Sequence, residues 1–251
     1  RELLDTGRFT AHVGADGQER WRQEGARVDV LLPAGLEGLF SERLERLSQL
    51  DRRVVDAVAL SGAEVEHVVL ARAIGRVGAA EDLLDPSAPS DEERISVLCK
   101  SGWLVRAPGG TVAIASAATA AAACAAMGGA YRRQLHAALG DAIVACLGDT
   151  PRLAARLAAH WTGAGRPALD YWVRAADEAE RTTAFRDAVV CLGRARAELA
   201  GSTTGESVIA LDRRLARALL SAGQLEDAVR AAGFVLAEVP TDIEAVVTRA
   251  W

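Results

Sequence analysis

The sequence is poor in lysine, methionine, aromatic residues and cysteine. Lys100 is the only lysine, so the positive charge is carried almost entirely by arginine. A P-loop ATP site needs a Gly-Lys-Ser/Thr sequence behind a glycine-rich turn. Lys100 lies in Cys99-Lys100-Ser101 without the preceding glycines, which excludes such a site within these residues. The 4 cysteines form no C-x-x-C pair, so we expect free thiols in a reducing compartment and neither a metal site nor a disulfide.

Long hydrophobic runs are also missing. The one candidate for a membrane span, residues 112–127, is rich in alanine, which contributes little transfer free energy. Hydrophobic residues make up 50% of the 251 residues, with 23 glycines and 7 prolines, which excludes a disordered or collagen-like chain. No signal peptide is visible, and we expect a cytoplasmic protein without a membrane segment. Because Met127 is the only methionine and the first residue is Arg1, the sequence reads as a fragment of a longer protein.

The N-terminal quarter predicts a small hairpin followed by a helix. Short runs of residues on either side of the Asp16-Gly17 turn signal predict a β-hairpin within residues 3–21. After Pro33, apolar residues recur at spacings of three and four up to Leu47, which is typical of an amphipathic helix.

The next segment predicts three helices and two strands. We expect a helix with Asp51 as its N-cap, a second over residues 64–74, and a third after Ser90 that runs to Cys99. Residues 103–106 and 111–114 predict two strands joined by a Pro-Gly-Gly turn. Three helices followed by a two-stranded wing are the order of a winged helix, a variant of helix-turn-helix.

From Ser116 onward the sequence predicts helices alone, joined by short segments that make neighbours antiparallel. Residues 185–189 and 225–229 match each other at an offset of 40, and small residues recur at tetratricopeptide positions such as Ala216 and Ala228. The expected fold is therefore mainly α, a winged-helix domain followed by a superhelix of antiparallel helical hairpins. We expect the boundaries 1–48 (end of an ATPase module or linker), 49–115 (winged helix), 116–150 (connecting helices) and 151–251 (a tetratricopeptide-like superhelix, truncated at its C-terminus).

The order of these pieces resembles the STAND-class ATPase regulators of the MalT and large LuxR type. Four short matches carry the resemblance, and they occur in the family's order and spacing: residues 32–36 with 41–47, residues 98–105, residues 131–136, and residues 157–161 with Ala164-Gly165. The resemblance implies an upstream ATPase module with ATP and Mg, a downstream DNA-binding domain, and no cofactor within the chain itself.

One departure from the family concerns Ser116. Members place an aromatic-Arg-His-Pro run 20 residues before the Leu-His pair that ends here at His136, and this sequence has Ser116 at the place of the histidine. In related signalling ATPases that histidine helps to hold bound nucleotide in the resting state. Its loss puts nucleotide-gated switching in doubt.

Most chemically capable residues have a structural interpretation. The predicted third helix of the winged helix begins with Asp91, Glu92 and Glu93, which would repel DNA phosphates, so we expect no direct nucleic-acid contact by this segment. His136 and His160 have no second ligand at a suitable spacing in the local sequence, which favours a packing role. No catalytic constellation is present, and the chain is not expected to be an enzyme.

The superhelix offers the best candidate surface. On the tetratricopeptide register, the first helix of each pair lines a concave groove. The residues expected to face that groove, and to bind a small-molecule or peptide effector or another domain, are Asp170, Val173, Asp177, Glu180, Arg213 and Arg217. A solvated charged face is the equally weighted alternative.

The resulting hypothesis is the regulatory segment of a bacterial LuxR-type STAND transcription regulator. Its partners would be its own upstream ATPase and downstream DNA-binding domains, an effector, and a second copy in self-association. Two alternatives stay open from the sequence. The same segment could be the regulatory arm of a nucleotide cyclase or kinase, or a passive protein-interaction scaffold.

Overall fold

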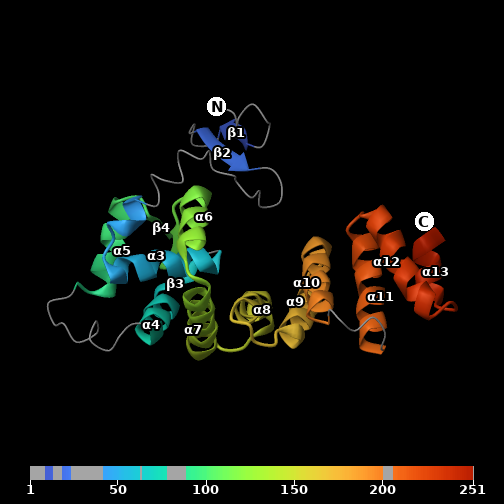
Figure 1. Cartoon of the computed structure of the whole chain (residues 1–251). Helices are drawn as coiled ribbons and strands as arrows, with labels where there is room; N and C mark the ends of the chain where they lie inside the picture. The colour runs from blue at the N-terminus through green and yellow to red at the C-terminus, as the bar shows by residue number, and fades with distance from the viewer. Residues whose placement is uncertain are drawn as a thin grey trace. The chain divides into compact units, whose positions relative to one another are not determined.

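The structure is a computed structural model that describes residues 9–13, 19–23, 42–62, 64–77, 89–199 and 206–250 (Figure 1). The chain divides into two compact units, Arg1–Leu39 and Phe40–Trp251. The described residues are mainly helical, as the sequence predicts. None of their helices has the length and apolar character needed to cross a membrane.

The first unit contains the predicted hairpin. Strands β1 (Phe9–Val13) and β2 (Glu19–Gln23) pair antiparallel, with Phe9 opposite Gln23 and Val13 opposite Glu19. This confirms the hairpin, while its turn lies outside the described residues. Most of the helix predicted after Pro33 and up to Leu47 also lies outside them. Residues 42–45, which belong to the second unit, are helical, and this helix ends before Leu47.

After the helical turn at residues 42–45, the described part of the second unit contains three helices and a three-stranded sheet within residues 49–114, which we call the α3–β5 module. Helix α3 (Gln49–Ser61) was expected to be capped by Asp51, and this is wrong. The cap is Ser48, whose Oγ accepts from the Asp51 N–H at 3.1 Å and donates to the Asp51 carboxylate at 2.7 Å. Asp51 lies in the first turn, where its charge favours the helix N-terminus.

The sheet contains a strand that the sequence did not predict. Residues 65 and 66 form β3 (Val65–Glu66), so the helix expected over 64–74 begins only at α4 (His67–Val77). Strands β4 (Leu104–Ala107) and β5 (Thr111–Ile114) are antiparallel, and β3 pairs with β5, giving the order β3-β5-β4. Two residues are too few for an alternating pattern, and only the pairing of Val65 with Val112 and of Glu66 with Thr111 defines this strand.

Helix α5 (Asp91–Lys100) begins where the sequence predicts. Ser90 and Glu93 form a complete capping box, because each side chain bonds the backbone N–H of the other residue. Gly102, at a φ of 76°, turns the chain out of the helix and into β4. The core beneath the sheet includes Leu70, Leu98 and Leu104, all fully buried.

The rest of the chain is the helical array: α6 (Ala117–Ala126), α7 (Gly129–Leu147), η2 (Pro151–Leu153), α8 (Ala154–Gly163), α9 (Leu169–Arg181), α10 (Phe185–Glu198), α11 (Glu206–Ser221), α12 (Leu225–Glu238) and α13 (Ile243–Ala250). From α7 to α13, each α-helix contacts the next α-helix in the chain, and α11 also contacts α13. The short η2 turn between α7 and α8 contacts α8 and α9. No strand occurs in residues 115–199 or 206–250, as predicted.

Two glycines allow α7 and α8 to cross closely. A Cβ atom at Gly140 would lie 2.5 Å from the Trp161 ring, and a Cβ at Gly163 would lie 2.5 Å from the His136 ring. Each glycine therefore accommodates an aromatic ring of the facing helix. One core of buried residues runs from Leu44 through the α3–β5 module and the array as far as α11.

Candidate functional site

The predicted groove residues all lie on two helices, α9 and α11. Asp170, Val173, Asp177 and Glu180 are on α9, and Arg213 and Arg217 are on α11. Asp170 is exposed, and Val173 packs half-buried against the core. The cation that joins α9 to α11 is one that the sequence reasoning missed, Arg214.

Arg214 bridges two of the acidic residues of α9, Asp177 and Glu180. Its Nη2 donates to Asp177 at 2.6 Å and to Glu180 at 3.0 Å. The Arg214 side chain is 22% exposed, so these bonds form in a partly desolvated position. Burial alone would lower the pKa of Arg214, but the hydrogen bonds to Glu180 and Asp177 outweigh it and raise that pKa.

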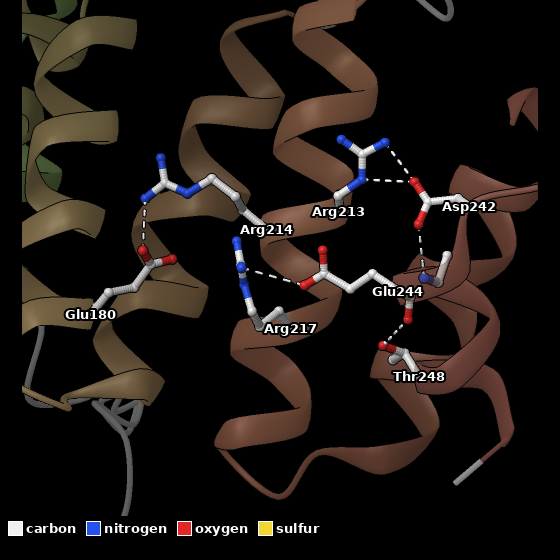
Figure 2. Close-up of polar contacts among 8 residues, drawn as sticks. Glu180, Arg213, Arg214, Arg217, Asp242, Glu244 and Thr248 are labelled. Atoms are coloured by element: carbon white, nitrogen blue, oxygen red, sulfur yellow. Dashed lines mark hydrogen bonds and ion pairs between the residues drawn. The ribbon is translucent and has the colours of Figure 1, made fainter.

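The two predicted arginines turn instead toward α13 (Figure 2). Arg213 Nε donates to Asp242 at 2.7 Å, and Arg217 lies 3.4 Å from Glu244. Asp242 also accepts from the Ala245 N–H at 2.9 Å, which caps the first turn of α13. That backbone hydrogen bond and the Arg213 guanidinium hold the pKa of Asp242 below its usual value.

These contacts form a charge ladder, defined here as Asp177, Glu180, Arg213, Arg214, Arg217, Asp242 and Glu244. Acidic residues of α9 and α13 lie on either side of the basic residues of α11. The ladder fixes three successive first helices to one another. A charged ligand at this surface would have to compete with existing pairs, each of modest strength where it is exposed.

A second set of contacts connects the array to the α3–β5 module. Arg156 of α8 donates to Glu66 of β3 at 3.0 Å, and its second nitrogen lies 2.9 Å from the same carboxylate. Asp141 of α7 is bonded by Arg76 of α4 at 2.6 Å and by Arg166 at 3.1 Å. Burial would raise the pKa of Glu66, but hydrogen bonds from Arg156 and the backbone lower it overall.

The two motif histidines meet across the α7–α8 crossing, which their local sequence did not predict. The Nδ1 atoms of His136 and His160 are 3.1 Å apart, so one ring donates and the other accepts. Burial, with the nearby charges of His136 and Arg156, lowers the pKa of His160 to about 3. No group of three or more potential metal-binding side chains occurs among the described residues.

Ser116 has a local role in the structure. It is the N-cap of α6, and its Oγ accepts from the Thr119 N–H at 3.1 Å. Ser116 thus starts the alanine-rich helix.

The exposed surface of α5 is mainly acidic. Asp91, Glu92 and Glu93 are exposed, and Glu92 contacts Arg106 at 2.6 Å. Arg94 is 7% exposed because it forms an ion pair with Asp51 at 2.8 Å.

The helices of the array form two grooves that the sequence reasoning missed. The α9 groove has a volume of about 590 Å³ and is lined from η2, α8, α9 and α10. The α11 groove has about 470 Å³ and is lined from α10, α11 and α12. The 40-residue repeat was the available signal, because it places equivalent residues in both grooves.

Comparisons of this chain with protein-family models, with curated proteins and with solved structures gave no significant match.

Proposed function

We propose that this chain is the regulatory segment of a signalling protein of the STAND type, most closely a LuxR-type transcription regulator. In this proposal the α3–β5 module is a winged helix and the helical array is a tetratricopeptide-like superhelix that receives an effector or partner. The element order α3-β3-α4-α5-β4-β5 with the strand order β3-β5-β4 supports the first assignment. Paired helices with a 40-residue repeat support the second.

The observation that carries the proposal is the connection between module and array. Helix α7 packs along α4, while Arg156 and Asp141 form ion pairs with Glu66 and Arg76 of the module. These contacts come from helices at the start of the array, directly beside the α7–α8 crossing. A change in the packing of the array therefore has a physical route to the module, through a pair of helices held at short distance.

The winged helix serves in this proposal as a switch and not as a DNA reader. Arg94 is buried in its pair with Asp51, so it is not free to contact a phosphate. The three carboxylates at the start of α5 remain at the surface, and phosphate contacts supply most of the affinity for DNA. DNA binding then belongs to another domain of the regulator, and ATP and Mg belong to an upstream module.

The test combines ligand screening with hydrogen exchange. Metabolites are screened by thermal shift, because a ligand that binds the native state raises its melting temperature. With the best ligand, exchange is expected to slow in α9–α12 and also in α4 and α5 of the module. In Arg156→Gln the slowing in α9–α12 remains and the slowing in the module is reduced.

Arg174→Gln is the matched control for that variant. Arg174 also pairs with a carboxylate, Asp149 at 2.7 Å, but entirely within the array. We expect it to leave the response of the module unchanged. Equal protection of the module in wild type and in Arg156→Gln would refute the proposed route.

A passive interaction scaffold is the second candidate. It is favoured by Ser116, which is engaged in capping α6 at the place where the family has its nucleotide-sensing histidine. A scaffold would bind its partner with slower exchange in the array alone. Slowed exchange in α4 and α5 of the wild type distinguishes the regulatory segment from it.

A further inference from the structure

The α9 groove and the α11 groove are equivalent parts of successive repeats. Each lies over the first helix of a pair and between the two second helices that flank it. Seven lining positions correspond at the offset of 40: Trp172 with Asp212, Ala175 with Leu215, Ala179 with Leu219, Ala184 with Gln224, Asp187 with Asp227, Val190 with Arg230, and Cys191 with Ala231. The repeat itself therefore builds the groove, and the residue types decide what each copy holds.

The two grooves differ in their floors. In the α9 groove the floor is Trp172, Ala175 and Ala179. At the equivalent positions the α11 groove has Asp212, Leu215 and Leu219. Leucine in place of alanine fills space, and Asp212 is engaged by Arg196 at 3.0 Å. The α9 groove is accordingly the larger and the less polar along its floor.

The shape of the α9 groove matches a helix. Its floor residues on α9 recur at positions 172, 175 and 179, a single stripe that extends for about 10 Å along the helix axis. One wall comes from η2 and α8, and the other from α10. An apolar stripe of about that length is what an amphipathic helix presents at positions i, i+3 or i+4, and i+7.

The rim adds charge of both signs on opposite walls. Arg152 on η2 and Asp187 on α10 are exposed, and neither forms an ion pair with another described residue. Glu178, on α9, is already bonded by Arg181 at 2.7 Å. Val190 on the α10 wall is 59% exposed, an apolar side chain facing solvent beside the groove.

We propose that the α9 groove docks an amphipathic helix from a partner protein. The apolar stripe of that helix lies on Trp172, Ala175 and Ala179. An acidic residue on one flank pairs with Arg152, and a basic residue on the other flank pairs with Asp187. This inference rests on the proposed function in one respect, that the array receives a partner; it adds the site and the chemistry of the partner.

The probe is a synthetic, fluorescein-labelled helical peptide of about 14 residues, which covers the length of the groove. It carries leucines at i, i+3 and i+7, glutamates on one flank and lysines on the other. Fluorescence anisotropy with the full 251-residue chain measures its affinity. A second peptide has the same composition but with the glutamates and lysines exchanged between flanks.

Val190→Glu is the test variant and Val97→Glu its matched control. Both valines are 59% exposed on a helix, and Val97 lies on α5, outside the array. We expect Val190→Glu to weaken the binding of the first peptide at least about tenfold, because a carboxylate would be desolvated in an apolar contact. Val97→Glu is expected to bind like the wild type. The exchanged peptide is expected to bind the wild type more weakly than the first peptide does. This difference in affinity between the two peptides is expected to be smaller in Arg152→Glu.

Three results would overturn the proposal. The first is an absence of binding by the wild type, and the second is equal affinity for Val190→Glu and Val97→Glu. The third is self-association of the chain in sedimentation experiments that Val190→Glu abolishes, since a second copy would then occupy the groove. If the peptide binds as expected but exchange in α4 and α5 is unchanged, the groove assignment stands and the regulatory function fails.

Discussion

Replacing Gly140 by alanine tests the closest contact between α7 and α8. The added Cβ would lie 2.5 Å from Cζ3 and 2.7 Å from Cη2 of Trp161. The ring cannot simply yield, because it is 7% exposed and held on two other sides. Tyr171 packs against it edge-on at a centroid distance of 6.3 Å, and the Arg166 guanidinium lies 4.9 Å from its centre. We therefore expect the two helices to move apart.

Two opposing contributions set the size of the effect. Exchange of glycine for alanine inside a helix ordinarily stabilises a protein by about 0.5–1 kcal/mol. Overpacking of a well-packed core costs about 1–3 kcal/mol. The balance is a loss of about 1 kcal/mol, which lowers the melting temperature of a chain of this size by about 2–4 °C.

Gly193→Ala is the control for this prediction. Gly193 is also inside a helix, α10, and a Cβ there would meet no atom within 4 Å. This substitution is expected to stabilise the protein by about 0.5–1 kcal/mol. Urea unfolding followed by far-ultraviolet circular dichroism measures both variants. If Gly140→Ala were as stabilising as Gly193→Ala, the close crossing of α7 and α8 would be refuted.

Three further predictions concern titratable and charged side chains. The pKa of His160 is about 3, below its unfolded value of about 6.5, so the stability is undiminished above pH 6.5 and decreases as the pH falls toward 3. Urea unfolding at several pH values should show a shallower decrease of stability in His160→Gln than in the wild type. An equal slope in the two proteins would contradict this prediction. Asp51→Asn leaves the buried Arg94 without its carboxylate and should cost about 2–3 kcal/mol in the same assay. Arg213→Glu places a second carboxylate beside Asp242 and should speed hydrogen exchange in α13, whereas unchanged exchange would show that the ladder does not hold that helix.

The last of these predictions changes an expectation from the sequence. Charge reversal at Arg213 and Arg217 would, on the template register alone, weaken effector binding and leave the fold intact. In the structure both arginines contact α13, and Arg213 bonds the residue that caps it. Release of α13 is therefore the first effect to expect. A loss of effector binding can be interpreted only after hydrogen exchange has measured this release.

Most of the helices could be predicted from the sequence, because their signals are local. The Ser90 and Glu93 capping box, the Pro-Gly-Gly turn before β5 and the three- and four-residue spacing of apolar positions each act within a few residues. Strand β3 could not be predicted, since Val65 becomes a strand residue only by pairing with Val112.

The sequence by itself determined the mainly helical class, the hairpin near the N-terminus and the repeat that spaces equivalent residues by 40. Only the tertiary structure decided which polar side chains meet: Arg214 with Asp177 and Glu180, Arg213 with Asp242, and His136 with His160. Neighbouring arginines on one helix differ in direction by about 100°, and a template places them less precisely than that. Contacts between helices depend on the crossing geometry, which here is set by two glycines and the rings that lie against them.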